Sequence, residues 1–480
     1  MVVNYNFDQN NRLFDNEIKL AINWLLKVRD TAAKGWAWVQ FIAPNEQNTA
    51  EVISALLENN SYLTNDMYFL IVESVKEWLL NPINHAKISI DWSWVLLALL
   101  KIKADEKLSN LISQESIDVS IAQCIQWLLI NQNDDGGWAD VKGDFSTTSR
   151  TALSLISLNK AILYTNDNAE IKNHIKIGVA WLLKNQNSDG GWGNMRETDI
   201  DRNYQNMLEL PYADLKYQCD SNASCTGYAL LALFEDVGSH RIAIGNGAKF
   251  IKKSQNKLGG WDVFSEVGIR SGNKYTFRHF STTWALKALL YTQSADYRDE
   301  CILHGINYLI QLQDNYYGGW KSSFDADNYT WATCNALETI RLIKTQLSEV
   351  KAKQFLQIVW DWWSLKKKES SFSLQLGRVN FAFNSSTCLL FCVIFTVMML
   401  FIAFFASDYV STVLSQAQTE NTIKLINGIV LVVGSFIIGL PWVVFVKNVF
   451  KRDMESWINS FGWVYGIITG FLLAFYQFIL

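Results

Sequence analysis

Apolar residues recur at helical spacing through the first 365 residues, in paired segments. The first segment of each pair carries an aromatic residue followed by apolar ones, at Trp24, Trp78, Trp127, Trp181, Phe250 and Tyr308. The second segment, such as STTSRTALSLISL or FSTTWALKALL, is apolar on most faces and begins with residues that cap helices. Because the aromatic positions are 49 to 69 residues apart, the pattern indicates an internal repeat of helix pairs.

The two kinds of helix need different surroundings. A helix that is apolar nearly all round must be buried, whereas the first helix of each pair keeps a polar face. Six inner helices ringed by six outer helices satisfy both patterns, so the predicted fold is all-α, an α6/α6 barrel. We expect this barrel over 1–348, then a linker helix with a basic juxtamembrane segment over 349–380, and a transmembrane domain over 381–480.

The last hundred residues contain three long stretches without a charged residue. Each exceeds the ~20 residues that span the bilayer core, so they predict transmembrane helices near 383–406, 425–446 and 458–480. Two basic clusters fall on one side of these spans: Lys366, Lys367, Lys368 and Arg378; Lys447, Lys451 and Arg452. The loop on the other side carries Asp408, Glu420 and Lys424. The positive-inside rule then predicts a multi-pass protein of the inner (cytoplasmic) membrane, with the barrel in the cytoplasm and the C-terminus outside.

Glycines recur every four residues in the third predicted span, at Gly462, Gly466 and Gly470. This spacing lines one helix face with small residues and permits close packing of another helix. Two partners for this face stay open: the first two spans of the same chain, or a second copy of the chain in a homo-oligomer.

The near-copies NQNDDGGW (131–138) and NQNSDGGW (185–192) follow two predicted outer helices. Alternating Asn and Asp before Gly is typical of the start of a calcium loop, which needs a Glu at its twelfth position. Lys142 and Arg196 stand there instead. We therefore predict no metal and no cofactor, and the pattern favours a Gly-Gly turn that ends a helix and is packed by a Trp.

Composition and charge limit the kinds of binding partner and the cellular compartment that we expect. With 49% hydrophobic residues and 20 Trp in 480 residues, the chain can bury a large core and still supply membrane helices. A net charge of −4 without a basic patch predicts no nucleic-acid partner. Seven Cys without regular spacing and an N-terminus without an apolar signal segment indicate reduced thiols in the cytosol.

Three segments share Gln, Gly and Trp at fixed spacing: Gln132, Gly136 and Trp138; Gln186, Gly190 and Trp192; Gln255, Gly259 and Trp261. They fit the Q-x3-G-x-W repeat of squalene and oxidosqualene cyclases. The first 365 residues therefore resemble the terpenoid cyclase and protein prenyltransferase superfamily, in its one-barrel arrangement. A further segment, with Gln313, Gly318 and Trp320, fits with one extra residue. The resemblance implies a structural role, in which Gln stacks on Trp and ties neighbouring outer helices together.

The resemblance also implies an acid, since triterpene cyclases protonate an alkene with the middle Asp of a D-x-D-D-T-A motif. Asn45, Gln47 and Asn48 stand at its three acidic positions, and an amide cannot donate such a proton. Asp325 and Asp327 precede another inner helix and are weaker catalytic candidates. Helix capping is the alternative explanation of these two carboxylates.

Prenyltransferases bind a diphosphate through basic residues and hold zinc through Asp, Cys and His. A predicted basic loop supplies candidate ligand-binding residues for a diphosphate or anionic headgroup: Arg270, Lys274, Arg278 and His279. Plain solvated surface is the alternative. Asp220, Cys225 and His279 have the side-chain types that bind zinc, but their spacing differs from that of the family, so no metal site is predicted.

Two hypotheses for the function remain. The sequence favours a barrel that binds a membrane lipid, an isoprenoid or a protein partner and is coupled to the transmembrane domain, as in a bacterial stress or phage-defence membrane effector. The alternative is an isoprenoid-processing enzyme, of the terpene cyclase or prenyltransferase kind, that acts on a membrane-derived substrate. Because the acidic motif is replaced by amides, the sequence leaves enzymatic activity open.

Overall fold

The computed structural model describes residues 14–39, 42–165, 168–199, 212–234, 240–270, 273–296, 299–314, 316–348, 372–376 and 379–383. The chain divides into two compact units, Met1–Ile358 and Val359–Leu480.

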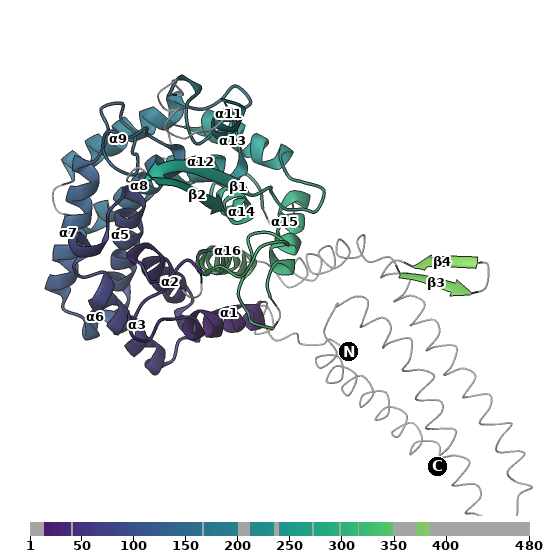
Figure 1. Ribbon diagram of the computed structural model, residues 1–480, viewed down its shortest axis with the longest axis horizontal. Coiled ribbons are helices and arrows are strands. Elements are labelled where there is room, and N and C mark those ends of the chain that lie inside the picture. The colour runs from purple at the N-terminus through teal and green to yellow at the C-terminus, as the bar shows by residue number, and fades with distance from the viewer. Residues whose placement is uncertain are drawn as a thin grey trace, which may run out of the picture. The chain divides into compact units, whose positions relative to one another are not determined.

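Helix pairs make up the described part of the first unit (Figure 1). The outer helices are α1 (Asp15–Lys27), α3 (Asn65–Trp78), α7 (Gln114–Ile130), α9 (Ala169–Lys184), α13 (Arg241–Lys253) and α15 (Glu300–Gln311). The inner helices are α2 (Glu46–Glu58), α5 (Ser89–Ala104), α8 (Thr148–Ala161), α12 (Ala223–Phe234), α14 (Ser281–Tyr291) and α16 (Thr330–Ser348). Short helices α4 (Pro82–His85), α6 (Glu106–Leu111) and α11 (Tyr212–Cys219) lie in the connections.

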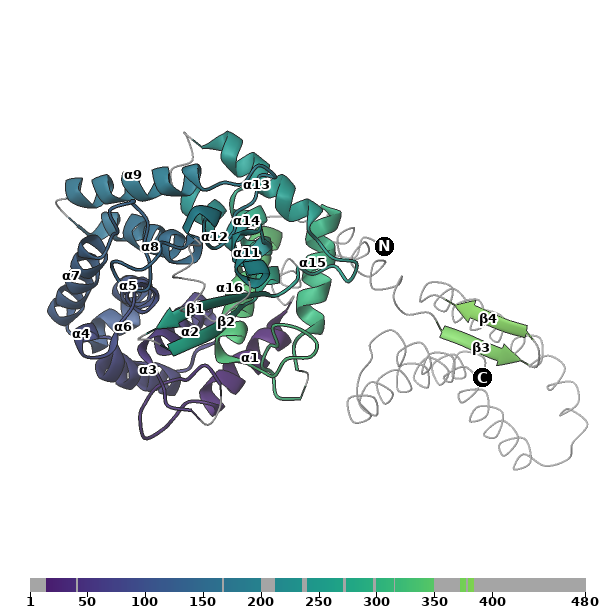
Figure 2. The same cartoon turned by 45° about the horizontal axis from the view of Figure 1, so that its top comes forward.

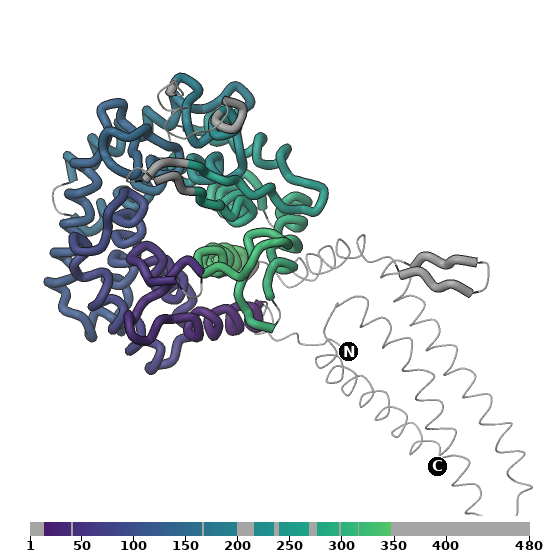
Figure 3. The backbone as a smooth tube through the Cα atoms, viewed as in Figure 1, coloured from purple at the N-terminus to yellow at the C-terminus, as the bar shows by residue number. Residues whose placement is uncertain are grey.

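The inner helices form a closed ring. Each contacts the next along the chain, and α16 returns to contact α2, as the tube in Figure 3 traces and the tilted view in Figure 2 makes visible from a second side. Nearly every residue of α2 and α5 is buried, whereas α1 and α3 bury one face. The expected mostly helical barrel of inner and outer helices is therefore confirmed for the described part of the first unit.

A recurring Trp joins the two helices of a pair in five of the described repeats. Its indole N–H donates to a backbone carbonyl near the end of the outer helix, at 2.6 to 2.9 Å, and its backbone N–H donates to a Thr hydroxyl of the inner helix, at 2.8 to 3.1 Å. The pairs are Trp36 with Thr49, Trp138 with Thr151, Trp192 with Thr226, Trp261 with Thr282 and Trp320 with Thr333. Each Trp is at most 1% exposed, so these buried polar groups are satisfied.

The Gln of the repeat links successive outer helices. Its amide nitrogen donates to the glycine carbonyl of its own turn and to a carbonyl in the next outer helix. The acceptors in that next helix are His174 for Gln132, Ala243 for Gln186, Cys301 for Gln255 and Glu17 for Gln313. The bond from Gln313 to Glu17, 2.9 Å long, joins the last outer helix to the first. The Gln-to-carbonyl hydrogen bond that links successive outer helices therefore also closes the ring.

A β-hairpin interrupts the helical pattern between α13 and α14. Strand β1 (Phe264–Arg270) pairs antiparallel with β2 (Asn273–His279), with Phe264 opposite His279. The all-α prediction is wrong here, since the segment expected to be a basic loop is paired strand. Alternation explains it: on β2, Thr276 and Arg278 are exposed while His279 is buried.

The described residues of the second unit form another antiparallel hairpin, β3 (Phe372–Leu376) with β4 (Val379–Phe383). Residues 349–371, which include the predicted linker helix, lie outside the described residues. From Phe372 the hairpin occupies the end of the predicted juxtamembrane segment, because FSLQL and VNFAF alternate polar and apolar residues. The predicted transmembrane segments beyond Phe383, with Gly462, Gly466 and Gly470, lie outside the described residues. Among the residues that are described, no helix is both long enough and apolar enough for a membrane span.

Candidate active site

Inner helices and the β1–β2 hairpin enclose a pocket in the barrel. Its volume is about 260 Å³, part of it open to solvent. The pocket is lined by Gln47, Glu51, Ile90, Trp94, Tyr228, Phe277, His279, Phe280, Trp284, Trp331 and Asn335. Six of these side chains are aromatic, and three are ionisable: Glu51, Tyr228 and His279. Such a wall suits an apolar ligand, with few polar groups left to orient it.

Helix α2 brings Gln47 and Glu51 into this pocket. Asn45 caps the helix by accepting from the backbone N–H of Asn48 at 2.8 Å. Residues four apart then share one face, and the Gln47 amide nitrogen donates to Oε1 of Glu51 at 2.7 Å. The other oxygen, Oε2, is buried without a hydrogen-bond partner among the described residues. Glu51 therefore presents one unsatisfied oxygen within a lining that is mostly aromatic.

Burial raises the pKa of Glu51 to about 8, and the negative charge of Glu338 acts in the same direction. The hydrogen bond from Gln47 and the charge of Lys287 oppose this shift but are smaller. Glu51 is consequently protonated at neutral pH, and its carboxyl group can donate a hydrogen bond or a proton.

Buried charges stand behind the pocket wall. The ammonium group of Lys287 lies 3.2 Å from Glu338 and donates to Asn335 at 3.1 Å. It also lies 3.8 Å from the centre of the Trp284 ring. Glu338 is also 3.6 Å from Lys101. Although burial acts to raise the pKa of Glu338, the two lysines lower it below its ordinary value. Glu338 is therefore ionised and paired with two lysines, whereas Glu51 is the neutral carboxyl group of the pocket.

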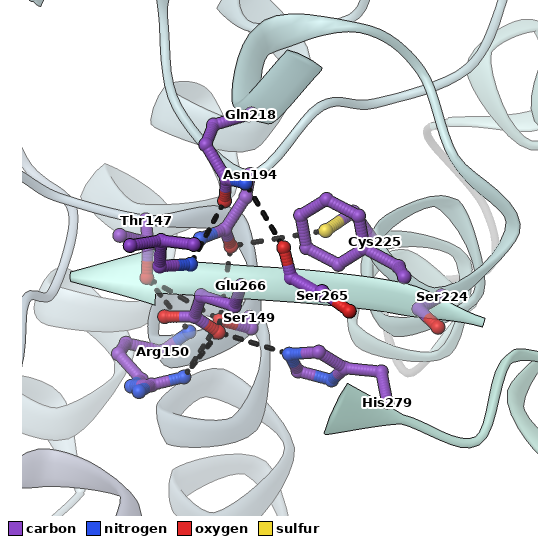
Figure 4. A network of polar contacts seen from close by, with 12 residues as sticks. Thr147, Ser149, Arg150, Asn194, Gln218, Ser224, Cys225, Ser265, Glu266 and His279 are labelled. Atoms are coloured by element: carbon purple, nitrogen blue, oxygen red, sulfur yellow. Dashed lines mark hydrogen bonds and ion pairs between the residues drawn. The ribbon is translucent and has the colours of Figure 1, made fainter. Parts of the chain in front are cut away.

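A second buried cluster holds the hairpin against α8 (Figure 4). Arg150 of α8 donates to Asp140 at 2.7 Å and to Oε2 of Glu266 at 2.9 Å. Glu266 lies on β1, and the same oxygen is 2.9 Å from Nε2 of His279 on β2. The Glu266 carboxylate thus ties both strands to α8 and places His279 beside the pocket.

The charge states of this cluster follow from its contacts. Burial acts to raise the pKa of Glu266, but Arg150 and the His279 hydrogen bond outweigh it and lower the pKa to about 2. Burial lowers the pKa of His279, and Glu266 only partly offsets that. At neutral pH the cluster therefore contains an ionised Glu266 and a neutral His279.

Further contacts position the hairpin backbone. Gln218 of α11 donates to the Ser265 carbonyl at 2.9 Å and accepts from the Val267 backbone N–H at 3.3 Å. Asn194 donates from its backbone to the Gln218 carbonyl at 2.7 Å and accepts from the Ser149 hydroxyl at 3.1 Å. The hairpin is therefore held on both its side chains and its backbone.

The predicted catalytic acids lie elsewhere. Asp325 is exposed and accepts from the Ser323 hydroxyl at 2.6 Å, and Asp327 is also exposed. The Ser323 hydrogen bond is the main cause that lowers the pKa of Asp325. Neither carboxylate lines the pocket. The arrangement fits a turn-stabilising carboxylate better than a proton donor, since a donor needs a raised pKa.

The predicted basic cluster is divided by the strand. Arg278 is exposed, whereas His279 is 1% exposed and paired with Glu266. The side chains of Arg270 and Lys274 lie outside the described residues. Alternate residues of a strand point to opposite faces, so Arg278 and His279 lie on different faces of β2. Anion binding by this basic cluster stays a prediction.

The residue types that could bind a metal ion are also dispersed in the part of the chain that the structure describes. Among the described residues, no group of three His, Cys, Asp or Glu side chains is placed to hold a metal ion. Cys225 is buried with Sγ 3.7 Å from Asn194, and Asp220 is exposed. Asp135, in the turn that looked like a calcium loop, accepts from Ser146 at 2.7 Å and from the Trp181 indole at 2.8 Å. Its carboxylate is used in building the turn.

Sequence reasoning missed Glu51, Glu266 and Arg150. Gln47 stands where the acidic motif has its middle Asp, and Glu51 follows it by four residues. Residues four apart share one face of a helix, and this spacing could have pointed to Glu51. Glu266 and Arg150 are 116 residues apart, and only the fold brings them together.

Two family models match overlapping parts of the chain. The Squalene-hopene cyclase C-terminal domain matches residues 150–277, a range that includes Arg150 and Glu266, and the Prenyltransferase alpha-alpha toroid domain matches residues 262–429. A squalene-hopene cyclase of Schizosaccharomyces japonicus is 28% identical over 167 residues, covering 34% of this chain and 23% of the relative. The squalene-hopene cyclase of Zymomonas mobilis is 28% identical over 189 residues, covering 39% of this chain and 26% of the relative.

The chain thus spans about a quarter of the length of these curated relatives. Among solved structures, the type II terpene cyclase MstE from Scytonema is similar with a TM-score of 0.41 and 14% identity, over 69% of this chain and 98% of that one. The two family models and the squalene-hopene cyclase relatives together support a terpenoid cyclase-like barrel for this protein.

Proposed function

We propose that the barrel is an isoprenoid-processing enzyme, which binds the reacting end of an apolar chain in the aromatic pocket and starts its cyclisation by a proton from Glu51. One observation carries the proposal: a buried, protonated carboxyl group with an unpartnered oxygen lines a pocket walled by aromatic rings. The matches to squalene-hopene cyclases support the same reaction class.

The acidity of Glu51 narrows the substrate. A carboxyl group with a pKa of about 8 carries its proton at neutral pH but is a weak acid. An isolated alkene is a very poor proton acceptor, whereas an epoxide oxygen is a better one. We therefore propose an isoprenoid with a terminal epoxide as the substrate class.

The first step balances as an isomerisation. The O–H bond at Oε2 of Glu51 breaks and a new O–H bond forms on the epoxide oxygen. One C–O bond of the epoxide breaks as the neighbouring C=C attacks the carbon that becomes electron-poor, which closes a ring and moves the positive charge along the chain. Aromatic faces such as those of Trp94 and Trp331 stabilise a cation in the pocket.

The space of about 260 Å³ in the pocket includes solvent at its open side, so only part of it is enclosed by the barrel. It suits the reacting end of a chain rather than a long isoprenoid as a whole. The remainder of the chain would leave through the open side of the pocket.

This proposal replaces the non-catalytic membrane effector that the sequence favoured. That hypothesis rested on the amides at Asn45, Gln47 and Asn48, together with the glycine face of the third predicted span. Glu51 provides a carboxyl group one turn further along the same helix. We keep as a separate proposal that the charge-free segments after Phe383 hold the protein in the inner membrane, with the barrel in the cytoplasm, and that the bilayer supplies the isoprenoid. Alkaline washing of membranes from cells that express the full chain tests it: the protein should stay in the pellet, and its release would exclude integral insertion.

The glycine face of the third predicted span extends the membrane proposal to a second copy of the chain. Native mass spectrometry of the full chain in detergent, with Gly466→Leu as the variant, measures the oligomeric state. A dimer that is lost in the variant supports this contact. A monomer in both proteins excludes it.

The catalytic proposal is tested by incubating the purified full chain with squalene, a terminal squalene epoxide and prenyl diphosphates, followed by product analysis by mass spectrometry. We expect cyclised isomers from the epoxide, and loss of at least about 100-fold in rate for Glu51→Gln. Glu77→Gln, on the exposed side of α3, is the matched control and should retain the rate. No product from any of these probes, or loss of activity in Asp325→Asn but not in Glu51→Gln, would refute the proposal.

A further inference from the structure

His279 is held in one tautomer by its contact with β1. Its Nε2 is 2.9 Å from Oε2 of Glu266. Glu266 is ionised, because Arg150 contacts the same oxygen at 2.9 Å, and an ionised carboxylate can only accept a hydrogen bond. The proton of the neutral imidazole therefore lies on Nε2, and Nδ1 carries the lone pair.

The free nitrogen is not used by the fold. Nδ1 of His279 is buried and has no hydrogen-bond partner among the described residues. A buried polar atom without a partner costs about 1–3 kcal/mol, so a histidine that only supported the core would normally have both nitrogens satisfied. His279 also lines the pocket that contains Glu51.

The surroundings of His279 fix the ring and limit which charges act on it. The Phe277 ring stands edge-on at 4.8 Å and the Tyr228 ring edge-on at 5.8 Å, and the Phe264 ring lies tilted at 5.6 Å. The ionisable groups that face it are Glu266 on β1, Arg150 on α8 and Tyr228 on α12. Burial raises the pKa of Tyr228, so this phenol stays neutral.

We propose that His279 is the base that ends the reaction: Nδ1 takes a proton from the carbon next to the final carbocation. This role rests on the proposed function of Glu51. The C–H bond breaks, its electron pair forms the C=C bond of the product, and a new N–H bond forms on Nδ1. The imidazolium that results is stabilised by the Glu266 carboxylate at Nε2.

Glu266 and Arg150 are positioning residues in this scheme. Glu266 holds the tautomer and compensates the charge that develops on His279, and Arg150 keeps Glu266 ionised. One proton leaves Glu51 and one arrives at His279 in each cycle, so exchange of one proton through water restores both groups and no oxidant or reductant is needed.

The activity test compares His279→Gln with wild type on the terminal squalene epoxide. Glu51 still starts the reaction in this variant, so epoxide consumption should stay within about tenfold of wild type. The ratio of olefin to water-trapped alcohol among the cyclised products should fall by about tenfold or more, because water then ends the reaction in place of the base. His304→Gln, on outer helix α15 and away from the pocket, should leave this ratio unchanged.

A second measurement keeps the two proposals distinguishable. The chain has 5 His, and ¹⁵N NMR of histidine-labelled full chain, assigned by the loss of one signal in His279→Gln, reports the tautomer directly. We expect an unprotonated Nδ1 in wild type and a changed tautomer in Glu266→Gln. A protonated Nδ1 overturns the role of His279 whatever the activity, and an unchanged product ratio in His279→Gln overturns it even if Glu51 is the acid. Absence of turnover in wild type refutes the proposed function, and the base with it.

Discussion

Gln47 donates a 2.7 Å hydrogen bond to Glu51, four residues further along α2. Within the resemblance to triterpene cyclases, Gln47 corresponds to the middle Asp of their acidic motif, and Glu51 lies one helical turn beyond it. The Gln47 amide thus orients the carboxyl group of Glu51. Because it donates to that carboxyl group, Gln47 favours the ionised form and limits the rise of the Glu51 pKa that burial causes.

The pH dependence of activity follows from this bond. Glu51 must be protonated to act, so kcat/KM should fall as the pH rises through the Glu51 pKa of about 8. Gln47→Leu removes the donor that lowers this pKa, and the alkaline limb of the profile should therefore move to higher pH. Measuring kcat/KM for the terminal squalene epoxide in both proteins decides this. A limb that stays in place or moves to lower pH contradicts the role of Gln47.

Replacing Glu51 by Gln should raise the stability of the folded chain, although it should lower the activity. The pKa of Glu51 is raised from 4.5 to about 8 in the folded chain, so above pH 4.5 the unfolded chain loses a proton that the folded chain keeps. This group therefore lowers the free energy of unfolding by about 1.4 kcal/mol per pH unit until the pH reaches its folded pKa. Glu51→Gln cannot ionise and should gain stability over wild type progressively from pH 5 to pH 8.

Denaturant unfolding of the full chain at several pH values measures this gain. Glu77→Gln is the control, and its difference from wild type should stay constant across the same range. A Glu51→Gln variant whose advantage does not grow with pH would show that Glu51 is already ionised in the folded protein.

The sequence predicts the ring of helices well, because the fold repeats a local pattern. The Trp138 and Trp192 positions specify the turn, and the Thr that accepts from each backbone follows 13 residues later in the first case and 34 in the second. An insertion therefore changes the spacing without changing the contact. Helical periodicity around each Trp is sufficient to predict the inner and outer layers.

The candidate site is harder to predict, since it depends on contacts between distant segments. Glu266 lies among mostly apolar residues in the sequence, in VFSEVGI. Only pairing of β1 with β2 and packing on α8 place it between Arg150 and His279. Asp325 has the sequence of a candidate acid yet lies exposed in a turn. Burial, which decides the pKa of a carboxyl group, is set by the whole barrel and not by its local motif.

Arg150 should be a stability determinant as well as a positioning residue. It is 2% exposed and compensates two buried carboxylates, Asp140 and Glu266. Arg150→Met leaves both without their cation and should lower the free energy of unfolding by about 3–5 kcal/mol. The double variant Arg150→Met with Glu266→Gln removes one of the stranded charges and should recover part of the loss. If the double variant is less stable than Arg150→Met alone, the pairing of Arg150 with Glu266 is not the source of the effect.

Closure of the ring should depend on Gly318. This glycine has a φ of +89°, and a Cβ added to it would lie 2.4 Å from the backbone carbonyl oxygen of Leu20 on α1. An L side chain is therefore strained there twice, by its backbone conformation and by a contact with a backbone atom that cannot rotate away. Gly318→Ala should push the last repeat away from α1 and weaken the bond from Gln313 to Glu17. We expect the free energy of unfolding to fall by more than about 1 kcal/mol.

Gly245→Ala is the matched control for this substitution. Gly245 lies inside helix α13, and a Cβ added there meets nothing within 4 Å. The same chemical change should raise the free energy of unfolding by up to about 1 kcal/mol, because alanine is the better helix former. Denaturant unfolding of both variants and hydrogen exchange of the α1 backbone measure the two effects. Equal stability changes in the two variants, or unchanged exchange in α1 for Gly318→Ala, would show that the ring is not held closed at this turn.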